Sequence, residues 1–413
     1  MKITLLTAYF YPEITAATHL LSDLTQDFAK YGAEVTVVTS IPTRGIDEET
    51  RKEYKCRNNE KAGPNIRIIR VGTDRDESKN FIVRAFRYGL NAYLIYHTAK
   101  QIESDVYLVS STPPFLGVAG AFLSKKTPTV YNLQDVFPDS LVNAGKTKEG
   151  SLLIRICRKV ERYIYKKQTN ILTISRDFKN LLLVRGTPEN KISMVYNWID
   201  ENQVVAVLRE KNILISRYGL NKDKFYVTYC GNIGHSQNLE MVVDIAKELA
   251  EDFPDLWFVF VGDGGWKNNI EQYIKDRSAD NVSLLPFQPY EEISHVMSLG
   301  DISLVCSKAH VGTSSFPSKT WSIMSANRPV LCSFDVDSEL CEIIKNASCG
   351  ICVPPDNKEA LKDAIIYAYE HREELKELGS NGRKYIETNL TRKAATLQYF
   401  EVLMKVAEKG RRR

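Results

Sequence analysis

Several features that define other protein classes are missing from this chain of 413 residues. No uncharged run reaches the roughly 18 residues of a membrane-spanning helix, and the short apolar start lacks the length of a signal-peptide core. The net charge of +4 is too small to indicate nucleic acid as a partner. With 22 Gly and 15 Pro, the composition also excludes collagen and low-complexity repeats. We therefore expect a folded, cytoplasmic enzyme of two or three domains.

Metal and redox motifs are also scarce. The eight cysteines are spread along the chain, as is typical of a protein in a reducing compartment. Cys349 and Cys352 have CxxC spacing, but no second pair with metal-ligand spacing accompanies them. Residues 350–353 have the pattern of a strand that runs into two prolines, which favours a buried strand over a redox or zinc site. No Asp-x-Asp pair has neighbours suited to a divalent cation, so we expect neither a metal nor a cofactor.

Short apolar segments alternate with helix-period segments, the pattern of parallel sheets covered by helices on both faces. The alternation occurs twice, which predicts an α/β protein with two doubly wound, Rossmann-like domains that face each other across a cleft. The expected divisions are residues 1–200, a linker at 201–224, a second domain at 225–385, and a terminal helix at 386–413 that packs back on the first domain. Ligands bind such sheets at the carboxyl ends of their strands.

Two glycine-rich crossovers follow predicted strands in the second domain. Gly231 and Asn232 end the strand that starts at residue 225, and Gly262 and Asp263 end the next one. Glycines let backbone amides approach a phosphate, and a following helix adds a partial positive charge. A tight turn is the structural alternative for each crossover. Neither matches G-x-G-x-x-G, which disfavours a nicotinamide site and favours a nucleotide diphosphate.

A third segment, residues 312–331, contains a proline suited to a first helical turn, three serines and one lysine. Ser314, Ser315 and Ser318 offer hydroxyl groups beside free amides, and Lys319 supplies a full charge. The segment is predicted to bind an anion, with simple helix capping as the alternative.

The order of these motifs resembles the family-4 retaining glycosyltransferases of the GT-B fold, over nearly the whole chain. The resemblance is closest to transferases that build bacterial capsule, O-antigen and exopolysaccharide units on a polyprenyl diphosphate lipid. Its main motifs are Gly231-Asn232-Ile233-Gly234, Val261-Gly262-Asp263-Gly264, Leu285-Pro286-Phe287, and Pro317-Ser318-Lys319 with the following Arg328-Pro329-Val330-Leu331.

The resemblance implies a site for a nucleotide diphosphate sugar, here expected to be a UDP-sugar. The implied donor-binding residues are Gly231, Asn232, Gly262, Asp263, Phe287, Ser315, Ser318, Lys319 and Ser322. Family members commonly carry two glutamates separated by seven residues, the second of which binds the donor ribose. This chain has Ser314 and Ser322 there, and Lys319 is the clearest remaining cation for the diphosphate.

The implied reaction transfers the sugar with retention at the anomeric carbon. Lys319 and helix-start amides would stabilise the departing diphosphate. Asp135 follows a predicted strand and is the first candidate to orient or deprotonate the acceptor, with a turn-forming role as the alternative; Asp139, Glu13 and His19 come next. The leaving phosphate can also take the proton itself. We expect His19 to be a surface or cap-region residue.

Basic residues cluster with apolar ones between Lys146 and Lys167 and near Arg84, Phe86 and Arg87. Such helices can lie on anionic lipid, although a solvated basic face is an equal structural alternative. A polyprenyl diphosphate-linked saccharide as acceptor favours a peripheral site on the inner face of the cell membrane. Two other functions remain open: a UDP-sugar 2-epimerase on the same fold, although none of the six histidines falls in an assignable pattern, and a non-catalytic nucleotide-binding partner of another transferase.

Overall fold

The computed structural model describes residues 1–13, 18–43, 45–72, 81–143, 145, 147–312 and 314–411, with the side chains of residues 81, 82 and 84 left out. The expectations for residues 14–17, Arg84, Lys146, Thr313 and residues 412–413 lie outside this part. The chain divides into two compact units. Unit 1 comprises residues 1–139, 149–197 and 393–413, and unit 2 comprises residues 140–148 and 198–392.

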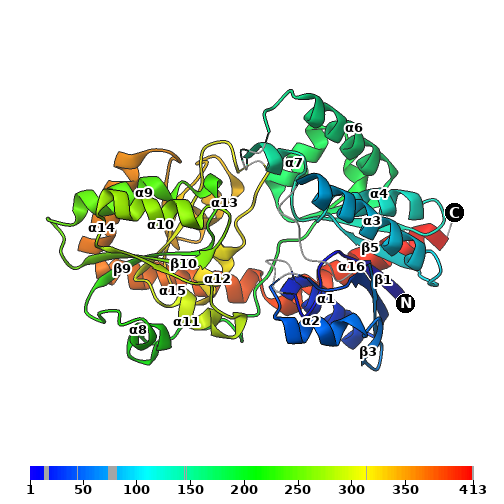
Figure 1. The fold of residues 1–413 in the computed structure, drawn as a ribbon, viewed down its shortest axis with the longest axis horizontal. Helices are drawn as coiled ribbons and strands as arrows, with labels where there is room; N and C mark the ends of the chain where they lie inside the picture. Colours follow the sequence, from blue (N-terminus) through cyan, green and yellow to red (C-terminus); the bar gives the residue numbers. More distant parts are fainter. Residues whose placement is uncertain are drawn as a thin grey trace. The chain divides into compact units, whose positions relative to one another are not determined.

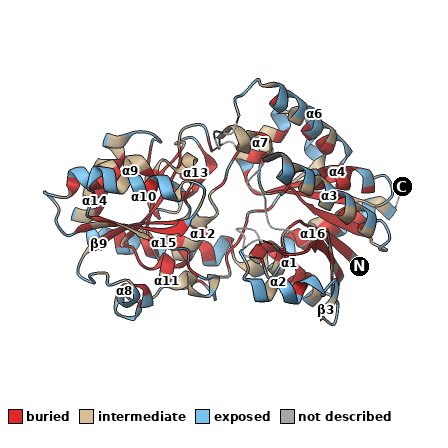
Figure 2. Cartoon of the chain, in the orientation of Figure 1, coloured by how far each residue is buried: buried red, intermediate tan, exposed pale blue. Residues whose placement is uncertain are grey.

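Unit 1 contains an eight-stranded sheet in the order β3-β4-β2-β1-β5-β6-β7-β8, in which only the edge pair β3 and β4 is antiparallel. The central strands are rich in β-branched residues and buried, as expected for a parallel sheet covered on both faces (Figure 2). The strands are β1 (Lys2–Leu6), β2 (Glu34–Ser40), β3 (Asn59–Gly63), β4 (Ile66–Val71), β5 (Val106–Ser110), β6 (Thr129–Leu133), β7 (Asn170–Thr173) and β8 (Ile192–Met194). The helices are α1 (Thr18–Lys30), α2 (Glu48–Lys55), α3 (Phe81–Ala99), α4 (Phe115–Leu123), α6 (Leu152–Lys167) and α7 (Arg176–Val184), with a 3-10 turn at Glu189–Lys191. Helix α5 (Asp139–Asn143) begins at the last residue of the first segment of unit 1, and its other residues belong to unit 2.

Unit 2 contains a six-stranded, fully parallel sheet in the order β11-β10-β9-β12-β13-β14. Figure 1 shows helices on both sides of this sheet. The strands are β9 (Phe225–Asn232), β10 (Leu256–Asp263), β11 (Val282–Leu285), β12 (Ile302–Cys306), β13 (Val330–Ser333) and β14 (Gly350–Val353). The helices are α8 (Ile213–Arg217), α9 (Leu239–Leu249), α10 (Lys267–Arg277), α11 (Ile293–Met297), α12 (Lys319–Ser325), α13 (Glu339–Asn346), α14 (Lys358–Glu370) and α15 (Arg372–Asn389), with 3-10 turns at Arg209–Lys211, His235–Gln237 and Tyr290–Glu292.

The expectation of a linker at residues 201–224 is corrected, because this segment packs into unit 2. The Arg209 guanidinium lies 2.7 Å from the Asp301 carboxylate, and the Asn212 side chain donates to the His295 carbonyl at 2.7 Å. These contacts anchor the segment to α11 and to the residue that precedes β12. The polar sequence that suggested a linker instead supplies hydrogen bonds and ion pairs.

The last helix, α16 (Arg392–Arg411), belongs almost entirely to unit 1. Phe400 packs against Phe28 of α1, with ring centroids 5.7 Å apart, and the Thr396 hydroxyl lies 3.0 Å from that of Tyr31. The helix before it, α15, ends at Asn389 and belongs to unit 2, so the terminal helix starts about six residues later than the expected boundary at 386.

Candidate functional site: the carboxyl edges of the two sheets

The two glycine-rich crossovers lie side by side at the carboxyl edge of unit 2, because β9 and β10 pair in parallel with Gly231 opposite Gly262. Gly262 has a φ of +156°, and a Cβ atom placed on it would lie 1.9 Å from the Gly231 carbonyl oxygen. A Cβ atom on Gly264 would lie 2.3 Å from the Ile233 carbonyl oxygen. Close backbone packing therefore accounts for these two glycines, as the tight-turn alternative required.

Gly231 has a different neighbour. A Cβ atom on it would lie 3.6 Å from the Lys319 ammonium nitrogen, and its own φ is +130°. The structure thus brings together the first crossover and the lysine that the sequence singled out 88 positions later. Lys319 is the first residue of α12 and projects toward the end of β9.

The Lys319 ammonium nitrogen is buried, and no residue in the described part of the chain accepts a hydrogen bond from it. It lies 3.7 Å from the centroid of the Tyr229 ring, a cation–π contact that compensates only part of the lost hydration. Burial lowers the pKa of Lys319 to about 8. The described residues therefore place an aromatic face, and no hydrogen-bond acceptor, beside this buried ammonium.

The serines around Lys319 contribute less than the sequence suggested. Ser318 precedes α12 with helical backbone angles and makes no capping bond with its side chain, and Ser315 is exposed. The amides of Thr320 and Trp321 already bond to the carbonyls of residues 317 and 318, at 3.1 Å each. The expectation that these serines lie beside free helix-start amides is therefore corrected for Thr320 and Trp321, whose amides are already bonded in this seven-residue helix.

Ser314 and Ser322, at the positions of the two family glutamates, differ in environment. Ser314 is buried and donates to the Val311 carbonyl at 3.4 Å, whereas Ser322 is half-buried on α12, one turn after Ser318. Ser314 is therefore occupied in holding its own loop.

Three further donor candidates lie at the same edge. Asn232 and Asp263 are exposed strand ends, and an Asp263 oxygen accepts the Gly264 amide at 2.8 Å. Phe287 follows β11 and is 53% exposed. An exposed aromatic ring beside a glycine crossover can stack on a planar base.

Sequence reasoning missed a second cation, Lys308, which follows β12. Its ammonium lies 2.8 Å from Nε2 of His235, and the His235 ring meets the Trp266 ring edge-on at 4.9 Å. These side chains come from three different crossovers of unit 2. The position of Lys308 in the sequence could have revealed it, because Lys308 comes two residues after the end of an apolar strand, where ligand-binding side chains are expected.

Two missed carboxylates hold the loop that leads from Lys308 toward α12. Asp335 accepts the amides of His310 and Gly312 at 3.0 and 2.8 Å, and Asp356 accepts the amide of Ala309 at 2.9 Å. Asp335 follows β13 and Asp356 follows β14, so neighbouring strands fix the loop.

Unit 1 has its own pocket at the carboxyl ends of β1 and β2, with an open volume of about 270 Å³. Buried Glu13 accepts the Thr43 amide at 2.9 Å, and the hydroxyl groups of Tyr9 and Tyr88 are 2.8 Å apart. The pocket is lined by Ala8, Tyr9, Glu13, Ser40, Ile41, Thr43, Arg87, Tyr88 and Asn91. Among the acceptor-side candidates, Glu13 is thus the one that lines this pocket.

The other acid–base candidates differ in their exposure and in their charged neighbours. Asp135 is exposed just after β6. Asp139 contacts Arg158 at 2.6 Å and Arg185 at 2.9 Å; burial opposes ionisation, but these two cations keep its pKa below the usual value, so it is a structural anion. His19 lies half-buried in the first turn of α1, in agreement with the expectation of a surface or cap-region residue; burial lowers its pKa to about 4, so the ring is neutral near pH 7.

Helix α6 carries an exposed surface that is both apolar and basic. Its apolar members Leu152, Leu153, Ile156 and Val160 are 39–74% exposed. Arg155, Lys159, Arg162, Lys166 and Lys167 are exposed on the same helix. Aromatic contacts connect α6 through Phe122 of α4 to Tyr96 of α3, where further apolar residues are exposed. No helix in the described ranges is long and apolar enough to cross a bilayer.

Two family models together match most of the chain. Residues 17–203 match the model described as Glycosyltransferase Family 4, and residues 210–385 match the model described as Glycosyl transferases group 1. The chain is 24% identical over 409 residues to the colanic acid biosynthesis glycosyl transferase WcaI of Escherichia coli K12, covering 97% of this chain and 98% of WcaI. It is 25% identical over 294 residues to the glycosyltransferase WbjE of Pseudomonas aeruginosa, covering 71% and 72% of the two chains.

Solved structures give the same architecture. Sucrose-phosphate synthase from Thermosynechococcus elongatus aligns with a TM-score of 0.76 at 16% identity, covering 98% of each chain. HepE from Anabaena in complex with UDP aligns with a TM-score of 0.72 at 16% identity, covering 98% of this chain and all of HepE. HepE has also been solved with UDP-glucose. At these identities the likeness establishes the GT-B fold, in agreement with the expectation from sequence.

Proposed function

Because the chain belongs to the family-4 glycosyltransferases of the GT-B fold, we propose that it transfers a sugar from a UDP-sugar to a lipid-linked saccharide, with retention. The matched families and relatives are transferases, so the enzyme class is glycosyltransferase rather than epimerase or non-catalytic partner. The names of WcaI and its relatives support a place in bacterial surface polysaccharide synthesis.

The observation that carries this proposal is the buried ammonium of Lys319 next to the first glycine crossover, which has no hydrogen-bond partner among the described residues. As the bond between the anomeric carbon and the diphosphate oxygen breaks, negative charge grows on the diphosphate. Lys319 stabilises that charge at no reorganisation cost because its ammonium is already desolvated and fixed. Lys308 adds a second positive charge at the same edge of the sheet.

The nucleotide base stacks on exposed Phe287 in this proposal, and the diphosphate lies over Gly231 and Gly262. The UDP complexes of HepE, which has the same fold, support the choice of a uridine nucleotide. Ser322 is the nearest replacement for the ribose-binding glutamate, because it lies on α12 one turn beyond Lys319.

The acceptor side is assigned to unit 1. The new bond joins an acceptor oxygen to the anomeric carbon, and the acceptor proton passes to the leaving phosphate. Asp135 is exposed just after β6 and is the residue proposed to orient the acceptor hydroxyl. The apolar and basic surface of α6 supports attachment to an anionic membrane, where a polyprenyl diphosphate-linked saccharide would be found.

The test is incubation of the full chain with radiolabelled UDP-sugars and a polyprenyl diphosphate-linked monosaccharide. The expected product is a lipid-linked disaccharide with the donor's anomeric configuration and an equal amount of UDP. Lys319→Met tests the assigned site, with Lys275→Met as a control because Lys275 is exposed and pairs with Glu271 at 2.9 Å. Isomerised sugar nucleotide without transfer would contradict the proposal.

A further inference from the structure

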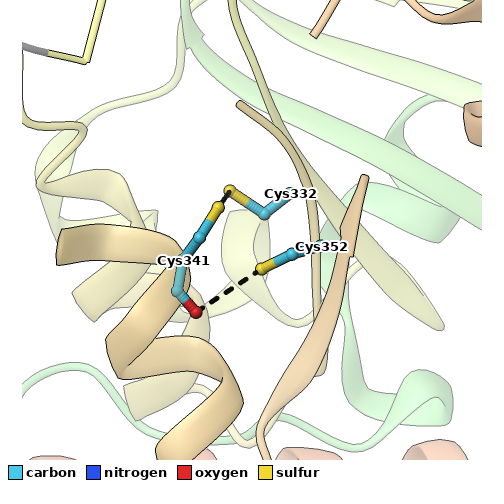
Figure 3. Close-up of side chains that lie close together, drawn as sticks. All are labelled: Cys332, Cys341 and Cys352. Carbon is cyan, nitrogen blue, oxygen red and sulfur yellow. Dashed lines mark hydrogen bonds between the residues drawn. The ribbon is translucent and has the colours of Figure 1, made fainter. Parts of the chain in front are cut away.

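Three cysteines that no sequence motif connects meet on one face of the unit 2 sheet. Cys332 on β13 and Cys352 on β14 are paired in register, so their side chains point to the same face. Cys341 lies in the first turn of α13, which packs against that face. Figure 3 shows the three side chains pointing toward one another.

The distances between the sulfurs suit a common ligand. The Sγ atoms of Cys332 and Cys341 are 4.0 Å apart, and all three sulfurs lie within 4.8 Å of one another. Thiolates that share one tetrahedral Zn²⁺ at about 2.3 Å lie about 3.8 Å apart, so each must move by about 1 Å or less. Cys332 and Cys341 are buried and Cys352 is half-buried, which leaves an approach from one side.

Cys341 is held in place by a helix cap. The Ser338 hydroxyl accepts the Cys341 amide at 3.4 Å, at the start of α13. The cap fixes the first turn of α13, which carries Cys341.

We propose that Cys332, Cys341 and Cys352 bind one thiophilic metal ion of the class of Zn²⁺, with a water molecule as fourth ligand on the side of Cys352. Each thiol releases its proton to solvent as its sulfur binds the ion. The site is structural: it ties α13 to β13 and β14 and so supports Asp335, which lies between Cys332 and Cys341 in sequence and holds the loop near Lys319. It plays no part in the sugar transfer.

The CxxC spacing of the sequence is not what forms this site. Cys349 is buried, but its thiol donates to the Ile344 carbonyl at 3.6 Å, outside the cluster. Cys352 alone of that pair joins the site, together with two cysteines 20 and 11 positions earlier. Only the pairing of β13 with β14 makes them neighbours.

The test is a titration of the reduced, metal-free full chain with Cd²⁺, followed by ultraviolet thiolate-to-metal charge transfer, and competition by Zn²⁺. We expect one ion per chain and a rise in melting temperature with Zn²⁺. Cys341→Ser and Cys352→Ser should each lose more affinity than the roughly 10–100-fold that loss of an outer-shell partner costs. Both readouts are independent of glycosyl transfer.

Cys349→Ser is the matched control, since it is also buried beside α13 but lies outside the cluster. Exposed Cys56→Ser is a second control in case the first does not fold. Both should bind Cd²⁺ like the parent chain. Absence of the charge-transfer band, unchanged affinity in Cys341→Ser, or a disulfide between Cys332 and Cys341 found by mass spectrometry in the reduced preparation would each overturn the proposal.

Discussion

The carboxyl edges of the two sheets are built in different ways. In unit 1, the pocket after β1 and β2 is lined by side chains that are held by hydrogen bonds within the unit, such as Glu13 with the Thr43 amide. In unit 2, the edge consists of glycine backbone around one buried ammonium that has no partner among the described residues. The first edge is therefore built from side chains, whereas the second is built from backbone around a buried ammonium. This difference supports the proposal that the charged donor binds to unit 2.

Among the glycines at the unit 2 edge, Gly262 is expected to tolerate substitution least. Gly262→Ala places a methyl group 1.9 Å from the Gly231 carbonyl at a φ of +156°. We expect a loss of about 3 kcal/mol or more in the free energy of unfolding, because backbone must move. Denaturant unfolding measures it. Gly265→Ala is the control, since no atom lies within 4 Å of its Cβ position, and equal stability of the two variants would contradict the packing argument.

The role of the buried Lys319 ammonium is tested by Lys319→Met. Removal of the ammonium should lower turnover by about 100-fold or more, as for other preorganised groups that stabilise a developing anion. The same change should raise the unfolding free energy by up to about 3 kcal/mol, because the lysine pKa of about 8 instead of 10.5 reports the cost of burying its charge. Kinetics and thermal melts check the two effects. A variant that is both less stable and equally active would show Lys319 to be structural.

The apolar and basic surface of α6 provides a test of the proposed role of unit 1. Ile156→Glu on α6 should lower binding to vesicles that contain anionic lipid by about tenfold or more, because it puts a charge among apolar and basic groups. Added salt should release the parent chain as well. Sedimentation with vesicles measures both. Val184→Glu on α7 is the control, since Val184 is 86% exposed but outside the α6 surface; an equal loss in both variants would contradict the assignment.

The pH dependence gives a smaller effect with a defined sign. Between pH about 8 and 10.5 the unfolded chain keeps the Lys319 proton while the folded chain loses it, so stability rises with pH in this window. Donor affinity should fall there, by up to about tenfold per pH unit, because the neutral amine no longer attracts the diphosphate. Calorimetry with UDP from pH 7 to pH 10 measures the affinity. The same slope in Lys319→Met would exclude Lys319 as its source.

Much of the fold could be predicted from local pattern. The strand expected at residues 350–353 agrees with β14, and the strand expected from residue 225 to Asn232 agrees with β9, because buried parallel strands are short apolar runs between turn residues. The edge strand β3 was missed, since its sequence Asn-Glu-Lys-Ala-Gly is polar and carries no strand signal. Residues 201–224 were mistaken for a linker because their polar groups find partners only in the folded unit.

The sequence alone determined the two Rossmann-like sheets and the family, and it singled out Lys319 and the glycine crossovers, because these are carried by residue type and order along the chain. Only the tertiary structure decided which glycines are needed for packing and that no described residue accepts a hydrogen bond from the Lys319 ammonium. It also decided that Lys308 lies beside His235 and that three distant cysteines meet on one face of the unit 2 sheet. Such properties depend on distances between atoms of different strands. Parallel pairing sets those distances across 20 or more residues, a range over which local pattern carries no information.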